Sequence, residues 1–135
     1  MESQAHIDLV KIIYEYVINL VDEERRCLIT MDSLGQNSNV HVINNFVPDV
    51  FYSFNKLMII GEAKTELDFD RKHSQQQYEA YIKECAIFEG RSILIIGVPW
   101  QVSASARNYF RRKKNNNEID FEVVIIDEMG GSCIL

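Results

Sequence analysis

The stretch from Pro48 to Lys64, PDVFYSFNKLMIIGEAK, decides how this chain folds. Aromatic and other apolar residues fill both of its halves, and the polar residue Asn55 lies between them. Two such segments around a polar break are typical of a β-hairpin. We therefore predict strands over residues 40–54 and 56–64, joined by a tight turn near Asn55.

The length of this turn decides which side chains face each other. A two-residue turn at Asn55-Lys56, or a four-residue loop around it, sets Asp49 directly opposite Glu62 on one face of the hairpin. Lys64 shares this face, because residues two apart in a strand point the same way. We expect two carboxylates about 5 Å apart at the backbone, with an ammonium group one pleat away. A one-residue change of loop size would move Asp49 to the other face, so the register is testable.

These three charged groups indicate metal-dependent hydrolysis. Two carboxylates this close repel each other unless a cation joins them. Oxygen ligands of this kind suit Mg²⁺ or Mn²⁺, which retain water and accept phosphate oxygens. Such an ion polarises a phosphodiester and lowers the pKa of a bound water. Lys64 would then orient that water or stabilise charge on the phosphorane transition state.

The remaining sequence alternates helical and strand-like segments. Apolar residues at helical spacing and continuous apolar runs predict the order α-β-β-β-α-β-α-β. The predicted helices cover residues 6–21, 75–88 and 103–114, and the predicted strands cover residues 26–31, 40–54, 56–64, 91–98 and 119–127. A meander followed by crossovers indicates an α/β fold with a central mixed sheet and helices on both faces. The sequence shows no repeat and no shift in composition, so we expect residues 1–135 to form a single domain.

Pro48-Asp49 followed by Glu62-Ala63-Lys64 resembles the signature of the PD-(D/E)XK nuclease superfamily. The predicted order of elements resembles the restriction-endonuclease-like core of that superfamily, a three-layer α/β/α arrangement, over most of the chain. The resemblance implies that Asp49, Glu62 and Lys64 are catalytic, and that Asp49 and Glu62 bind the metal. The match is more specific than the letters of the motif alone, because the matching residues lie on adjacent predicted strands.

Two further matches extend the resemblance. Gln77 and Tyr81 are similar to the glutamine and tyrosine of the Q-x-x-x-Y motif, which follows the active-site strand in RecB-type members. Because they are four residues apart, they are neighbours on one helix face. The resemblance implies that Gln77 is catalytic, positioning substrate or metal-bound water, and that Tyr81 supports the site beside the substrate. Family members often carry a metal-binding glutamate in the first helix; Glu15 is the best match by position, with Glu2 and Glu23 as alternatives.

The charge of the chain is unevenly distributed. Its 14 Lys and Arg against 20 Asp and Glu give a net charge of −6, which argues against nonspecific binding of polyanions. Five basic residues nevertheless cluster in one predicted helix: Arg107, Arg111, Arg112, Lys113 and Lys114. At a helix end they suit the helix dipole, and they also suit the phosphates of a substrate. The sequence leaves both interpretations open.

Several classes of protein are disfavoured by the sequence. Its apolar runs are far shorter than the ~20 residues of a membrane-spanning helix. Its first residues are polar and do not form a secretory signal. The three cysteines are widely spaced, which is typical of reduced thiols, and His6, His41 and His73 lack metal-ligand spacing. We expect a cytoplasmic protein without membrane contact.

Together these observations predict a divalent-metal-dependent nuclease that uses Mg²⁺ (or Mn²⁺) and hydrolyses phosphodiester bonds, with DNA rather than RNA as the expected substrate. The alternative is a catalytically inactive nuclease-like domain that serves as a nucleic-acid-binding or assembly module. Phosphate contacts carry no sequence information. We therefore expect a homodimer, shape recognition or a partner subunit to supply the choice of target.

Overall fold

The computed structural model describes residues 3–32, 41–117 and 120–135. Its main elements, in chain order, are α1 (Gln4–Ile18), β1 (Thr30–Met31), β2 (Val50–Phe54), β3 (Leu57–Ala63), α2 (Lys72–Ile87), β4 (Arg91–Val98), α3 (Ser103–Asn117), β5 (Glu122–Asp127) and β6 (Ser132–Ile134). The 3₁₀ helices η1 (Glu23–Leu28) and η2 (Trp100–Val102) precede β1 and α3. None of the helices in these described ranges has the length and apolarity that a membrane crossing requires.

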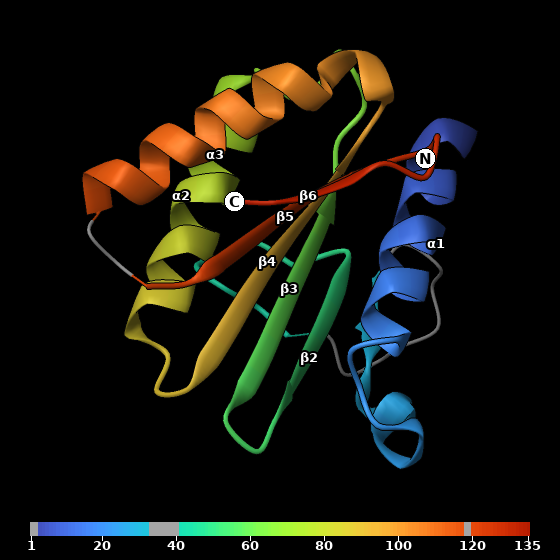
Figure 1. The fold of residues 1–135 in the computed structure, drawn as a ribbon, viewed down its shortest axis with the longest axis vertical. Coiled ribbons are helices and arrows are strands. Elements are labelled where there is room, and N and C mark those ends of the chain that lie inside the picture. The colour runs from blue at the N-terminus through green and yellow to red at the C-terminus, as the bar shows by residue number, and fades with distance from the viewer. Residues whose placement is uncertain (1–2, 33–40, 118–119) are drawn as a thin grey trace.

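Within the described residues, β1 to β6 form one sheet in chain order. β3, β4 and β5 are parallel, and the other neighbouring pairs are antiparallel. Figure 1 shows α1 on one face of the sheet and α2 and α3 on the other. Buried hydrophobic residues form one cluster under α1 and another under α2 and α3. The predicted α/β class, with a central mixed sheet flanked by helices, is confirmed; the restriction-endonuclease-like assignment stays a prediction.

The hairpin of β2 and β3 has the predicted two-residue turn. Residues 55–56 have φ values of 49° and 65°, and two successive positive φ angles are characteristic of a type I′ turn, whose twist matches that of the strands. Val50 pairs with Gly61, so the next pair along the ladder is Asp49 and Glu62. The predicted register is confirmed.

α1 packs closely against the sheet because two glycines face it. Ile13 is fully buried on α1. A Cβ atom built on Gly61 of β3 would lie 2.6 Å from the Ile13 side chain, and one on Gly97 of β4 would lie 2.9 Å from it. The absence of these two Cβ atoms lets α1 lie directly on the centre of the sheet. The position of α1 matters for the site, because its first turn contributes a side chain there.

Two strands are less than half as long as the sequence predicts. In the segment 26–31, residues 26–28 belong to the 3₁₀ helix η1, and only Thr30–Met31 pair with β2. The strand predicted from residue 40 begins at Val50. Pro48 has no N–H to donate to a sheet, and residues 43–46 form a separate turn in which Ile43 and Phe46 exchange backbone hydrogen bonds.

Other boundaries also differ. β6 follows Gly130-Gly131 and is an additional strand, too short to show a pattern in the sequence. α2 begins at Lys72, three residues earlier than predicted, and α3 extends to Asn117. The predicted starts of two strands, residues 40 and 119, lie outside the described residues.

Candidate active site

Three charged side chains gather at the carboxyl end of β3. Asp49 precedes β2, Glu62 lies in β3 and Lys64 follows it, and the three residues are 5%, 4% and 8% exposed. The Lys64 N–H donates to the Gly97 carbonyl of β4 (2.9 Å), so pairing continues beyond the end of β3. The Ala63 N–H donates to Oδ2 of Asp49 (2.9 Å) and fixes this carboxylate across the hairpin. The structure therefore brings together the three residues that the sequence singled out.

Two polar side chains of α2 join this group. Nζ of Lys64 lies 3.5 Å from Oε2 of Glu62 and also donates a hydrogen bond to Oε1 of Gln77. The hydroxyl of Tyr81 donates to Oε1 of Glu62 at 3.0 Å. Burial and the charge of Glu62 both raise the pKa of Tyr81, so its hydroxyl remains a donor. Gln77 and Tyr81 thus contact the charged residues from one face of α2.

His6 also belongs to the site, which no pattern in the sequence predicts. It lies in the first turn of α1, and its Nε2 is 3.2 Å from Oδ2 of Asp49. Ser3 caps the helix by accepting the His6 N–H at 3.2 Å, which fixes the start of α1 at this point. No spacing pattern marks His6, because its partner lies 43 residues away in the chain.

The two carboxylates differ in proton affinity. Burial raises the pKa of Glu62 well above its ordinary value of 4.5, and the charge of Asp49 raises it further, although Lys64 and Tyr81 act in the opposite direction. Burial also acts to raise the pKa of Asp49. The hydrogen bond and charge of His6, with a backbone N–H, outweigh burial and lower that pKa below 3.8. Asp49 is therefore the ionised partner, and Glu62 retains its proton to a higher pH than an ordinary glutamate does.

This carboxylate pair fits a divalent cation of the Mg²⁺ type. One or two carboxylates suffice for Mg²⁺, because water and substrate phosphate supply the other ligands. A cation beside Asp49 and Glu62 would replace the proton of Glu62 and remove the repulsion between the two carboxylates. Among the described residues, no group of three or more His, Cys, Asp and Glu side chains is arranged to hold a metal. A site of the Mg²⁺ kind does not require such a group.

The structure does not bring Glu15 to the carboxylates. Glu15 follows His6 by nine residues on α1, which is about 13.5 Å along the helix axis and half a turn around it, and its side chain is exposed. Glu23 is exposed at the start of η1, and Glu2 lies outside the described residues. α1 thus reaches the site through His6 at its N-terminal end and not through a glutamate on its polar stripe.

The basic segment of α3 also lies away from the carboxylates. α3 starts beside η2, at the carboxyl end of β4, and runs back along the sheet, so its basic last turns lie towards the opposite end (Figure 1). Lys113 forms an ion pair with Glu79 of α2. Lys114 donates to the carbonyl of Leu135 at 2.8 Å. The three arginines of the segment are at least partly exposed: Arg107, Arg111 and Arg112.

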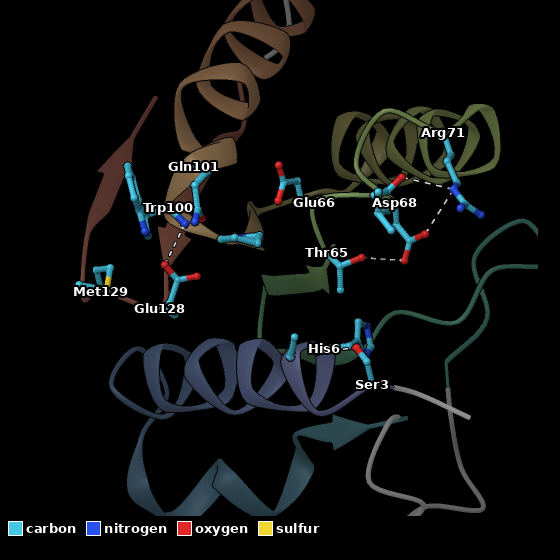
Figure 2. Close-up of a pocket in the computed structure, with 13 residues that line it drawn as sticks. Ser3, His6, Thr65, Glu66, Asp68, Arg71, Trp100, Gln101, Glu128 and Met129 are labelled. Carbon is cyan, nitrogen blue, oxygen red and sulfur yellow. Dashed lines mark hydrogen bonds and ion pairs between the residues drawn. The ribbon is translucent and has the colours of Figure 1, made fainter.

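A cleft of about 930 Å³ opens beside the carboxylates. It lies beyond the carboxyl ends of β3 and β4, and Figure 2 shows His6 and Thr65 towards one end and Trp100 and Glu128 at the other. The carboxyl ends of strands are where open α/β sheets bind ligands. Asp49, Glu62 and Lys64 do not line the cleft, but His6 lines it and contacts Asp49, and Thr65 lines it directly after Lys64.

None of the protein-family models, curated proteins and solved structures compared with this chain matches it. The chemistry of the site is therefore inferred from its own contacts. The most informative of these are the hydrogen bond from the Ala63 N–H, which fixes Asp49 across the hairpin, and the position of Lys64 beside Glu62.

Proposed function

We propose that this protein is a divalent-metal-dependent nuclease of the PD-(D/E)XK superfamily, with the restriction-endonuclease-like fold, and that it hydrolyses the phosphodiester bonds of DNA. The observation that carries this proposal is the pair of buried carboxylates, Asp49 and Glu62, at one end of the β2–β3 hairpin, with Nζ of Lys64 3.5 Å from Glu62. Two carboxylates and one ammonium group at a single buried site are side chains suited to metal-assisted phosphodiester hydrolysis.

Asp49 and Glu62 would hold Mg²⁺ (or Mn²⁺), which when bound polarises the phosphodiester and lowers the pKa of a coordinated water. Lys64 orients the attacking water and stabilises the negative charge that develops on the phosphate. Gln77 holds the ammonium group of Lys64 in place through its Oε1. Tyr81 orients Glu62 by donating to it, and His6 keeps Asp49 ionised.

Selection of the target requires more than this site. Phosphate contacts position a nucleic acid but do not read its sequence. Arg111 and Arg112 are exposed on α3 and are available to such contacts, with Arg107, Lys113 and Lys114 on the same helix. We propose that dimerisation, recognition of DNA shape or a partner subunit supplies the remaining specificity.

A cleavage assay with matched variants tests this function. Supercoiled plasmid and an end-labelled single-stranded oligonucleotide are incubated with the protein in Mg²⁺, in Mn²⁺ and in EDTA. The proposal expects cleavage with either metal and none in EDTA. Lys64→Ala should lower the rate by about 10²–10³-fold, the size of effect seen when one charge-stabilising donor is removed. Lys11→Ala, which removes an exposed lysine from the outer side of α1, should cleave as the unmodified protein does.

Thermal unfolding of each variant shows whether a loss of cleavage reflects a loss of fold. Unchanged cleavage in folded Lys64→Ala would overturn the proposed mechanism. Binding of DNA without cleavage under any of these conditions would favour the alternative, a catalytically inactive module for nucleic-acid binding or assembly.

A further inference from the structure

The cleft beside the carboxylates carries an exposed aromatic ring. Gly97 of β4 pairs with Ala63, the last residue of β3. Trp100 follows Gly97 by three residues and so lies at the same edge of the sheet as Lys64. Its side chain lines the cleft, and the residue is 57% exposed. The hydrophobic core therefore does not account for this tryptophan.

The backbone around Trp100 is held at several points. Pro99 fixes the chain at φ −60° as it leaves β4. The Trp100 N–H donates to Oε1 of Glu128 (2.9 Å), and the N–H of the buried Val102 donates to the Pro99 carbonyl (2.9 Å). An aromatic ring on a fixed backbone loses little conformational freedom when a flat ligand stacks on it. Trp100 is thus suited to act as a stacking surface.

The charges of the cleft favour a neutral, polar ligand over a phosphate. Glu66, Asp68 and Glu128 contribute three carboxylates, against the guanidinium of Arg71, which lies 3.5 Å from Asp68, and the imidazole of His6, which already contacts Asp49. This excess of negative charge repels phosphate. Carboxylates and the amide of Gln101 can instead form hydrogen bonds with the edges of nucleobases.

We propose that this cleft binds an unpaired nucleobase, stacked on Trp100, from a nucleotide that flanks the phosphodiester cut at Asp49 and Glu62. This rests on the proposed nuclease function and names its substrate class. In a duplex the bases stack on each other and offer no free face to an indole, whereas every unpaired base has one. The enzyme therefore acts on single-stranded DNA, or at ends and flaps where at least one base is unpaired.

Fluorescence reports directly on this cleft, because Trp100 is the only tryptophan of the chain. The protein is titrated in EDTA, which prevents cleavage, with a single-stranded oligonucleotide and with the same strand in a blunt duplex. We expect saturable quenching by the single strand and little change with the duplex. The anisotropy of a labelled oligonucleotide supplies the Kd independently of the tryptophan.

Three variants sharpen the test. Trp100→Ala should weaken single-strand binding by about tenfold or more, the loss expected when one base stack is removed. Trp100→Phe keeps an aromatic face and should restore most of the affinity. Phe54→Ala removes an exposed aromatic residue from the other end of the β2–β3 hairpin and should leave the Kd unchanged.

The outcomes separate this proposal from the nuclease function. Single-strand binding that leaves Trp100 fluorescence unchanged, or a Trp100→Ala Kd equal to that of the unmodified protein, overturns the base-binding cleft even if plasmid cleavage is observed. Quenching together with a complete lack of metal-dependent cleavage overturns the nuclease proposal and supports the cleft as a base-binding site.

Discussion

Nε2 of His6 lies 3.2 Å from Oδ2 of Asp49, and this contact joins the first turn of α1 to the hairpin across 43 residues of sequence. The same carboxylate oxygen accepts the Ala63 N–H. The contact is the main reason why the pKa of Asp49 is low in spite of its burial. His6 thus favours the ionised form of Asp49, the form that can bind a cation.

His6→Ala should shift acid unfolding to higher pH. A carboxyl group whose pKa is lowered in the folded state stabilises the fold above its unfolded pKa, and this contribution disappears as pH falls through the folded pKa. Without His6, burial raises the pKa of Asp49, so this stabilising contribution is removed and the less stable protein unfolds at a higher pH. Circular dichroism from about pH 2 to about pH 6 measures the midpoint pH of acid unfolding. An unchanged midpoint would show that His6 does not lower the pKa of Asp49.

Glu62→Gln should stabilise the metal-free protein above neutral pH. The raised pKa of Glu62 means that the folded state holds a proton which the unfolded state releases near pH 4.5. Stability is therefore lost as pH rises from that value through the folded pKa. Glutamine stays neutral and can keep the hydrogen bond from Tyr81. In EDTA, the Tm of the variant should therefore vary less between about pH 5 and about pH 9 than that of the unmodified protein, and it should be higher at the upper end of this range.

The same substitution should abolish stabilisation by metal. Mg²⁺ at about 100-fold above its Kd is expected to add about 2.7 kcal/mol to the free energy of unfolding of the unmodified protein. Glu62→Gln leaves one carboxylate, Asp49, and should respond little. Equal stabilisation of both proteins by Mg²⁺ would mean that the ion binds elsewhere.

Much of this site could be predicted from the hairpin alone. A strand has a period of two and a two-residue turn fixes the register, so the positions of Asp49, Glu62 and Lys64 follow from local rules. Helical spacing predicts that Gln77 and Tyr81 share one face of α2, and their place at the site is implied by the family resemblance. Short-range geometry is what a single sequence encodes most clearly.

The contribution of α1 could not be predicted in this way. Glu15 stands on the polar stripe of α1, but the helix meets the site at its N-terminal end, through His6. That orientation depends on Ile13 packing against Gly61 and Gly97, which are distant in sequence. No periodicity within the helix contains this information.

Gly61→Ala should destabilise the protein through this packing. The new Cβ would lie 2.6 Å from Cγ2 of Ile13, which is fully buried and cannot move away freely. Overpacking of this kind costs about 1–3 kcal/mol. Urea unfolding of Gly61→Ala, Ile13→Ala and the double variant measures it: the double variant should lose less than the two single losses added together. Additive losses would show that the two residues do not interact.

The most direct test of a shared metal site is a crystal of the protein soaked in Mn²⁺ above neutral pH, with the ion located by its anomalous scattering. A shared site predicts one peak about 2 Å from a carboxylate oxygen of Asp49 and from one of Glu62, and no such peak in crystals of Glu62→Gln. Mn²⁺ bound at other residues, with both carboxylates free of the ion, would contradict it.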